Sequence, residues 1–133
     1  GVLAMFCSQA GAKHVYAIEA SSSALYSQKL IQANGLEKKI TVINKTIEDM
    51  VTEKDSYDFL LGKVDVIVSE PLGLLLVNER MLESYLVARD NLLKTGGKMF
   101  PSYSVMHFIP FMDENLYNSQ LAKVKFWGGN NFF

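Results

Sequence analysis

The sequence is poor in cysteine and proline, with one cysteine and three prolines among its 133 residues. The single cysteine, Cys7, excludes an internal disulfide and favours a reducing compartment. An excess of charge of either sign is also missing, because the formal net charge is only −1. No apolar run approaches the roughly 18 residues that a membrane-spanning helix needs. We therefore expect no direct binding to nucleic acid and no association with a membrane.

The start of the chain lacks the features of a complete N-terminus. Gly1–Phe6 contains no initiator methionine and no basic segment of a signal peptide. A doubly wound α/β sheet would also place a strand and a glycine-rich turn before the first helix, and neither precedes residue 2. We expect that the sequence opens within a domain and that the first strand lies outside it.

What is present is an alternation of helical and strand-like segments, with 49% apolar residues to build a core. Short apolar runs rich in β-branched residues predict strands over residues 14–18, 40–43 and 64–68. Apolar periodicity, serine caps and glycine stops predict helices over residues 2–10, 24–33, 79–94 and 113–125. Less regular patterns predict a strand over residues 98–111 that Pro101 interrupts, a polar connection over 50–63, and loops over 46–49 and 127–131. This order indicates an α/β fold with a parallel sheet, in which ligands bind beyond the carboxyl ends of the strands.

The stretch after the third predicted strand holds two glutamates, Glu70 and Glu79, on either side of a short loop. Pro71 lacks an N–H group and ends the strand, and Gly73 permits a positive φ that lets the chain turn back. Two carboxylates across a small gap would bind a planar cation, and the natural candidate is guanidinium with its five donors. For Glu79 alone the competing interpretation is helix capping, with Asn78 as the N-cap and Glu79 in the first turn.

This loop resembles the double-glutamate loop of the protein arginine methyltransferases. The run Asn78-Glu79-Arg80-Met81-Leu82-Glu83-Ser84-Tyr85 is most similar to the coactivator-associated, type I branch, and the resemblance covers essentially the whole chain. One departure is Leu72-Gly73-Leu74, where the family usually has Met-Gly-Tyr, so an aromatic wall and a hydroxyl are missing beside the arginine pocket. The resemblance implies a protein-arginine N-methyltransferase in which Glu70 and Glu79 are the catalytic residues that hold the substrate guanidinium.

The resemblance also implies the architecture. Residues 1–100 would form a partial Rossmann-like methyltransferase domain that lacks its first strand, with Gly1 as the last glycine of the glycine-rich turn. Residues 101–133 would be the incomplete start of a β-barrel domain with part of a dimerisation arm. Residues 50–63 would contain an insertion, because they exceed the usual link of the family.

The cofactor implied by the resemblance is S-adenosylmethionine. Glu19, at the end of the second family strand, would bind both ribose hydroxyls, and Glu48 would meet the adenine amino group with Ile47 beside the ring. Met81 and Ser84, one helical turn apart, would line the methionine end. Met81 also resembles a residue associated with asymmetric dimethylation.

Each of these residues has a plainer interpretation from the sequence alone. Glu19 would be a solvated carboxylate at a strand end, Glu48 would form an ordinary surface pair with Asp49, and Met81 would fill the core. An acid in the position of Glu19 suits a nicotinamide dinucleotide as well. His14 and His107 have no second ligand at metal spacing, and Cys7 has no cationic neighbour in sequence, so we interpret all three as structural.

Two other functions stay open. A nicotinamide-dependent oxidoreductase would need a Tyr-x-x-x-Lys pair or a complete Gly-x-Gly-x-x-Gly motif, and the sequence contains neither. A truncated, non-catalytic fragment or pseudoenzyme that acts by association agrees with the missing glycine-rich turn and with Leu74. We expect the isolated chain to be inactive and poorly soluble, because the missing strand would leave a sheet edge exposed.

The family resemblance implies partners as well. The substrates would be arginine-containing proteins such as histones, transcription proteins or RNA-binding proteins. The full protein would be a homodimer found in the nucleus and the cytoplasm.

Overall fold

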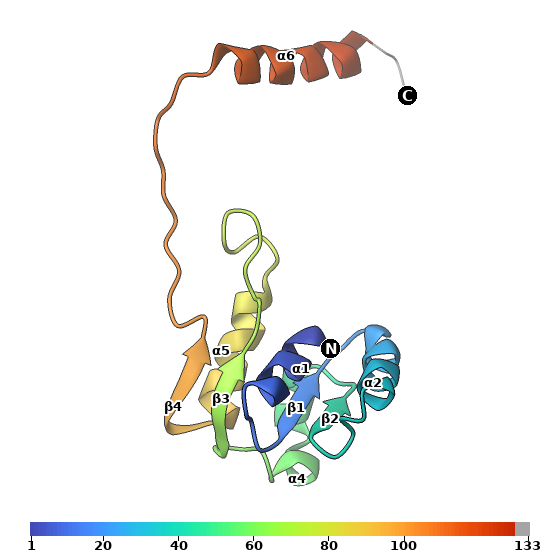
Figure 1. Ribbon diagram of the computed structural model, residues 1–133. Coiled ribbons are helices and arrows are strands. Elements are labelled where there is room, and N and C mark those ends of the chain that lie inside the picture. The colour runs from blue at the N-terminus through green and yellow to red at the C-terminus, as the bar shows by residue number, and fades with distance from the viewer. Residues whose placement is uncertain (130–133) are drawn as a thin grey trace.

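Four short strands form two parallel pairs in the computed structural model, which describes residues 1–129. β1 (Val15–Ile18) pairs with β2 (Ile40–Ile43), and β3 (Val64–Val68) pairs with β4 (Leu93–Phe100). Figure 1 shows the strands in the order β4, β3, β1, β2. Among the described residues no backbone hydrogen bond joins β3 to β1. The predicted α/β class with parallel strands is confirmed.

Helices connect and cover these strands. They are α1 (Val2–Gln9), α2 (Ser23–Ala33), α3 (Ile47–Thr52), α4 (Lys54–Tyr57) and α5 (Met81–Leu92). The helix α6 (Glu114–Gly129) follows β4 along the chain and lies apart from these strands in Figure 1. The predicted helices at 2–10, 24–33, 79–94 and 113–125 are therefore confirmed within a few residues at their ends. Each strand pair is joined through a helix, as parallel pairing requires.

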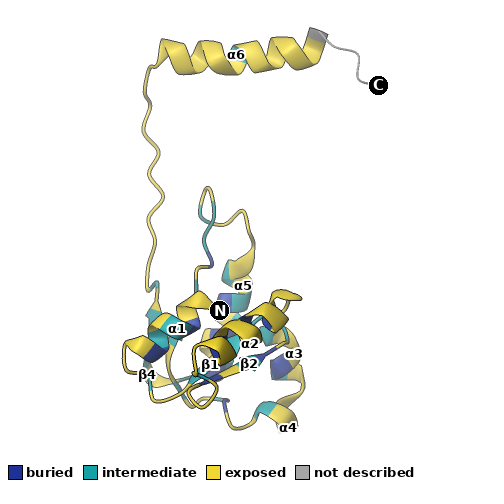
Figure 2. Cartoon of the chain, turned by 45° about the vertical axis from the view of Figure 1, so that its right-hand side comes forward, coloured by how far each residue is buried: buried dark blue, intermediate teal, exposed yellow. Residues whose placement is uncertain are grey.

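The core consists of two apolar clusters, one for each half of the body. The first packs α1 and α2 on the β1–β2 pair through Ala4, Ile31 and Ile40. The second packs α3, α5 and the 57–61 region together through these buried residues: Ile43, Met50, Leu60, Ala88 and Leu92. Figure 2 shows this burial within the body, whereas α6 and the segment before it are exposed.

The predicted loop at 46–49 and the polar connection at 50–63 are wrong in part. Thr46 Oγ1 accepts a hydrogen bond from the backbone N–H of Asp49 over 3.0 Å and caps α3, which begins at Ile47. The side chain of Met50 is 0% exposed and that of Leu60 is 2% exposed. Long-range burial of these two residues, more than local helix propensity, orders the segment.

The helix α5 begins two residues later than predicted, and this difference decides how Glu79 is interpreted. The helix begins at Met81, its N-cap is Arg80, and Arg80 has a left-handed backbone with φ of 57°. Asn78 therefore does not cap the helix, and Glu79 precedes its first turn. The capping interpretation of Glu79 is excluded by this geometry.

Three further expectations differ from the structure. β4 starts at Leu93, directly after α5, and Gly96 and Gly97 lie in an irregular stretch of this strand instead of ending the helix. No strand follows Pro101 in the described part of the chain, because this segment meets no partner strand there. Of the predicted 127–131 loop, residues 127–129 belong to α6, and Asn130 and Asn131 lie outside the described residues.

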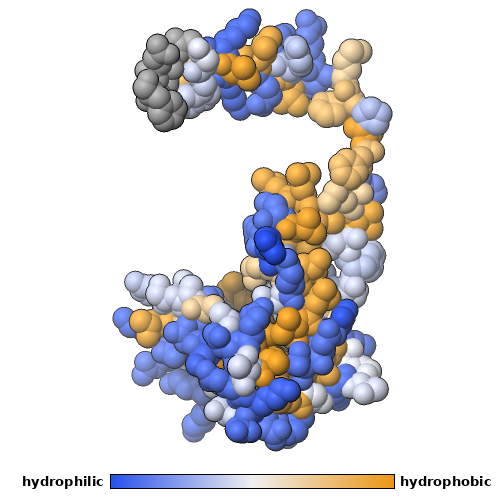
Figure 3. All heavy atoms as spheres, turned by 180° about the vertical axis from the view of Figure 1, so that it is seen from behind, coloured by the Kyte–Doolittle hydropathy of each residue, from blue (hydrophilic) through white to orange (hydrophobic). Residues whose placement is uncertain are grey.

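The segment after β4 leads away from the body. Residues 101–113 run extended to α6, which lies apart from the body in Figure 1. Figure 3 shows hydrophobic side chains along this segment and on the protruding loop before α5. Met112, for example, is 97% exposed. Within residues 1–129 no helix has the length and apolar character needed to cross a membrane.

Candidate functional site

Glu19 stands at the carboxyl end of β1, where the chain turns toward α2. Its Oε1 accepts a hydrogen bond from the backbone N–H of Ser21 over 2.9 Å. The amide of Asn44, from the end of β2, donates to the carbonyls of Glu19 (2.7 Å) and Ser21 (3.0 Å) and holds the two strand ends together. The backbone and side-chain hydrogen bonds from Ser21 lower the pKa of the Glu19 carboxyl. Glu19 is therefore a fixed, ionised acceptor, unlike a freely solvated side chain.

Glu48 lies in the first turn of α3, just beyond the carboxyl end of β2. Its Oε1 accepts a hydrogen bond from the hydroxyl of Ser84, on α5, over 2.6 Å. This contact joins residues 36 positions apart in the sequence. Glu48 is thus more than a member of a surface pair with Asp49. Ser84 therefore lies beside the acid that is predicted to bind adenine.

The other predicted cofactor residues are Gly1, Ile47 and Met81. Gly1 begins α1 and packs against α2, because a Cβ atom at Gly1 would lie 3.0 Å from Ser27 Oγ. Ile47 is half-buried against the second core cluster, next to Glu48. Met81, the first residue of α5, is 45% exposed, so it does not fill the core. α1, β1, α3 and α5 each contribute a residue at or just after an element end.

The loop between β3 and α5 forms a tight hairpin before it reaches Glu79. The backbone N–H of Leu76 donates to the carbonyl of Gly73 over 3.0 Å, and the N–H of Gly73 donates back over 3.3 Å. Positive φ angles occur at Leu75 (57°) and Leu76 (63°), and Gly73 has none. The expectation that Gly73 supplies the positive φ is therefore wrong, since two leucines adopt the left-handed conformation.

This hairpin folds the Glu79 side chain back toward the start of the loop. A Cβ atom at Gly73 would lie 2.6 Å from both Cγ and Oε1 of Glu79. The Glu79 side chain therefore lies against Gly73, which follows Glu70 by three residues in the sequence. That Glu70 and Glu79 face the same ligand stays a prediction. Both glutamates are exposed and accessible to a ligand. Leu74, at the hairpin tip, is 83% exposed.

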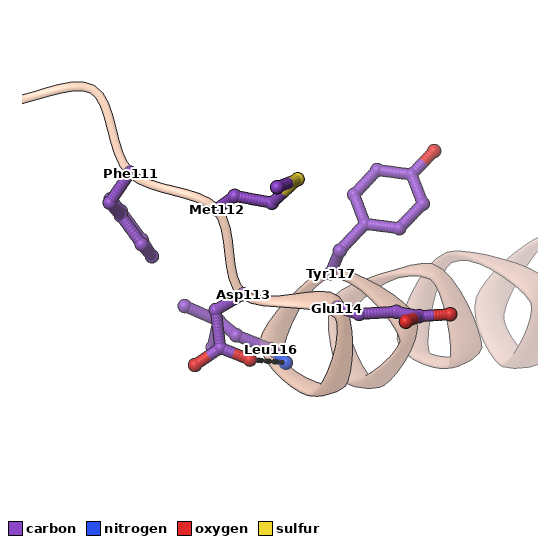
Figure 4. A pocket seen from close by; sticks show the side chains of 6 residues that line it. All are labelled: Phe111, Met112, Asp113, Glu114, Leu116 and Tyr117. Atoms are coloured by element: carbon purple, nitrogen blue, oxygen red, sulfur yellow. Dashed lines mark hydrogen bonds between the residues drawn. The ribbon is translucent and has the colours of Figure 1, made fainter.

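Two hollows in the surface are lined by residues other than these acids. One of about 490 Å³ is formed where the extended segment meets α6, and Figure 4 shows its lining: Phe111, Met112, Asp113, Glu114, Leu116 and Tyr117. There Asp113 Oδ1 accepts a hydrogen bond from the N–H of Leu116 over 2.9 Å, which caps the helix. Another hollow of about 320 Å³ lies beside α5, lined by Val77, Arg80, Leu82, Glu83 and Leu86. Neither hollow contains a predicted site residue, so we assign no cofactor to them.

The histidines and the cysteine have structural surroundings. His14 Nε2 lies 2.9 Å from Thr41 Oγ1, across the β1–β2 pair. His107 lies on the extended segment and Cys7 is half-buried on α1. Among residues 1–129 no group of three or more His, Cys, Asp or Glu side chains could hold a metal ion.

Some residues that shape the site were missed in the sequence. Asn44 was missed because nothing local shows that its amide reaches the carbonyl of Glu19. Thr46 could have been found, since Thr followed three residues later by Asp49 is a capping signal. Tyr85 was missed as well: its hydroxyl donates to the carbonyl of Pro101 over 2.9 Å and ties α5 to the end of β4.

Comparisons with proteins of known sequence give consistent matches, although no family model matches the chain. The chain is 49% identical to a probable histone-arginine methyltransferase CARM1 of Oryza sativa subsp. indica, over 100% of this chain and 24% of the rice protein. It is 50% identical to the histone-arginine methyltransferase CARMER of Drosophila ananassae, over 96% of this chain and 22% of the fly protein. The chain thus spans about a quarter of the length of the curated relatives it matches.

Solved structures agree with these sequence matches. One is the Trypanosoma brucei PRMT1 enzyme-prozyme heterotetrameric complex with AdoHcy, with a TM-score of 0.78 and 36% identity over 90% of this chain and 35% of that one. Another is Arabidopsis thaliana protein arginine methyltransferase 10, with a TM-score of 0.76 and 34% identity over 99% of this chain and 39% of that one.

Proposed function

Because the chain belongs to the protein arginine methyltransferase family, we propose that it is the central part of the catalytic region of such an enzyme. The reaction is methyl transfer from S-adenosylmethionine to the guanidinium of arginine residues in proteins such as histones. The observation that carries this proposal is the hairpin between Glu70 and Glu79, which folds the Glu79 side chain against Gly73 near the start of the loop. The names of the relatives support the substrate class, and the type I resemblance supports asymmetric dimethylation.

The acceptor groups at the strand ends fit S-adenosylmethionine. Glu19, fixed by Ser21, offers carboxylate acceptors to two neighbouring ribose hydroxyls. Glu48, fixed by Ser84, offers an acceptor to the adenine amino group, with Ile47 beside the ring. We therefore assign Ser84 to the adenine end, while Met81 remains assigned to the methionine end. When bound, the cofactor supplies the activated methyl group.

Glu70 and Glu79 are the proposed catalytic residues. Both would accept charge-assisted hydrogen bonds from the arginine side chain and hold its planar group in one orientation. These bonds draw positive charge toward the nitrogens that they engage, which leaves the attacking nitrogen richer in electrons. Orientation and electrostatics are the contributions that a protein can make to this reaction.

The finer architecture is part of the same proposal. We place the first strand of the Rossmann-like sheet between β3 and β1, because these two strands are neighbours in Figure 1 without hydrogen bonds between them. Residues 1–100 are then the partial methyltransferase domain. Residues 101–133, of which 130–133 lie outside the described residues, are the start of the barrel and dimerisation-arm region. The proposed assembly is a homodimer, located in the nucleus and the cytoplasm.

A non-catalytic role is the second candidate, and the unjoined strand pairs favour it for the isolated chain. The two proposals are separated by assaying the full-length protein with a histone-tail peptide and S-adenosylmethionine. Glu70→Gln and Glu79→Gln should each lower turnover about ten- to 150-fold, since each charged hydrogen bond contributes roughly 1.5–3 kcal/mol. Binding of S-adenosylhomocysteine should stay within about two-fold. Full activity in either variant would exclude the proposed catalytic role.

A further inference from the structure

Gly73 makes an unusually close approach to the side chains that follow it in the loop. A Cβ atom at this position would lie 2.6 Å from Glu79 Cγ, Glu79 Oε1 and Asn78 Oδ1. Real Cβ atoms essentially never approach another heavy atom this closely. Glu79 therefore occupies the space that any side chain at Gly73 would need.

The backbone of Gly73 does not itself require glycine. Its φ lies outside the left-handed region that L-residues avoid, unlike the φ angles of Leu75 and Leu76 beside it. Alanine at this position would therefore not meet the penalty of a left-handed φ. What opposes a larger residue at position 73 is its contact with the side chains of Asn78 and Glu79.

The atoms that a Cβ would meet belong to side chains with rotatable bonds. The paired hydrogen bonds between Gly73 and Leu76 hold the hairpin backbone in place. Relief of the contact would therefore come from a rotamer change of Glu79 and Asn78, which costs little folding free energy. The carboxylate of Glu79 would move by roughly 1 Å, and a misplacement of this size can cost on the order of 100-fold in rate.

We propose that Gly73 is a positioning residue for Glu79. Because glycine has no side chain, it leaves free the space in which the Glu79 carboxylate is held for the arginine guanidinium. This proposal rests on the proposed function, because it concerns the same catalytic group. It assigns to Gly73 a role in catalytic geometry that is independent of chain reversal, which the two leucines provide.

The test compares two glycine substitutions in the full-length protein. Gly73→Ala crowds Glu79, whereas the control, Gly97→Ala, crowds Leu93 Cδ1 at the same 2.6 Å distance on β4 and also the backbone oxygen of Lys94 at 3.0 Å. Three quantities are measured for each: kcat/KM for a histone-tail arginine peptide, Kd for S-adenosylhomocysteine, and the melting temperature. A crystal structure of Gly73→Ala then locates the Glu79 carboxylate.

We expect Gly73→Ala to lower kcat/KM on the order of 100-fold. Its Kd for S-adenosylhomocysteine should stay within about two-fold of the wild-type value. Its melting temperature should stay close to that of wild type, because only side-chain rotamers change. Gly97→Ala should keep kcat/KM within about two-fold. A role of Gly73 in stability alone would instead lower the melting temperature without a selective loss of kcat/KM.

Three results would overturn the proposal. They are an active Gly73→Ala enzyme, a Gly73→Ala protein that fails to fold, and an unmoved Glu79 carboxylate in its crystal structure. If wild type transfers methyl groups and only Gly73→Ala behaves unexpectedly, the positioning role fails and the proposed function stands. If wild type transfers no methyl group to arginine, both fail.

Discussion

Replacing Ser84 by alanine tests whether this hydroxyl holds the adenine-binding acid. The change removes the 2.6 Å hydrogen bond to Glu48 Oε1, whose length lies within the roughly 2.5–2.7 Å of charge-assisted O–H···O⁻ bonds. Such bonds contribute about 1.5–3 kcal/mol. Because Glu48 is exposed, water will replace part of what is lost. We therefore expect a loss of about 1 kcal/mol, or roughly five-fold in cofactor Kd.

Titration calorimetry with the full-length protein provides the assay. S-adenosylhomocysteine is compared with its deaminated, hypoxanthine-containing analogue, which cannot donate an amino hydrogen to Glu48. The Ser84→Ala change should weaken the adenine ligand about five-fold and the analogue less than two-fold. Ser56→Ala, an exposed serine on α4, serves as the control and should leave both affinities unchanged.

An equal loss for both ligands would place Ser84 at another part of the cofactor. No loss for either ligand would show that Glu48 does not depend on Ser84. Either result would refute the assignment of this pair to the adenine end.

The remaining predictions concern the elements that support the site. Thr46→Ala should lower the free energy of unfolding of the full-length protein in urea by about 1 kcal/mol, because the cap of α3 is lost. The control Thr52→Ser keeps a hydroxyl on the same helix and should change the free energy of unfolding little. Equal stability of Thr46→Ala and wild type would argue against the cap. The pKa of Glu19 is lowered from 4.5 in the folded state, so its contribution to stability is present above about pH 4.5 and is lost as the pH falls through the folded pKa. Wild type should therefore lose more melting temperature than Glu19→Gln between about pH 5 and pH 3, and parallel curves for the two proteins would contradict this. Leu74→Tyr should increase kcat/KM for the arginine peptide, because it restores the aromatic wall that the family usually has, whereas an unchanged value would show that the exposed tip does not reach the substrate.

Much of the fold follows from local patterns. The strands at 15–18, 40–43 and 64–68 are short apolar runs, and burial in a parallel pair requires such runs. The 50–63 region was harder to predict, since Met50 and Leu60 are ordered by residues of β2 and α5 that are distant in sequence. The unbroken passage from α5 into β4 at Leu93 likewise depends on pairing with β3, which local propensity does not report.

The candidate site could likewise be predicted from the sequence only in part. The positions of Glu19 and Glu48 at strand ends could be predicted because each follows a recognisable strand. A loop that turns back between Glu70 and Glu79 could be inferred from its two glutamates. The Ser84–Glu48 hydrogen bond could not, because it joins α3 to α5. The left-handed Leu75 and Leu76 were also beyond sequence reasoning, since local preferences assign positive φ to Gly73.

The most direct test of the account is mass spectrometry of a histone-tail peptide incubated with S-adenosylmethionine and the full-length protein. The account predicts that the peptide gains methyl groups on arginine, and that fragmentation assigns both groups of a dimethylated residue to one terminal nitrogen. Glu70→Gln and Glu79→Gln, assayed beside wild type, should each lose most of this gain. Methyl groups found only on other residues, or a gain that both variants retain in full, would contradict the claim that this acidic loop binds the arginine to be methylated.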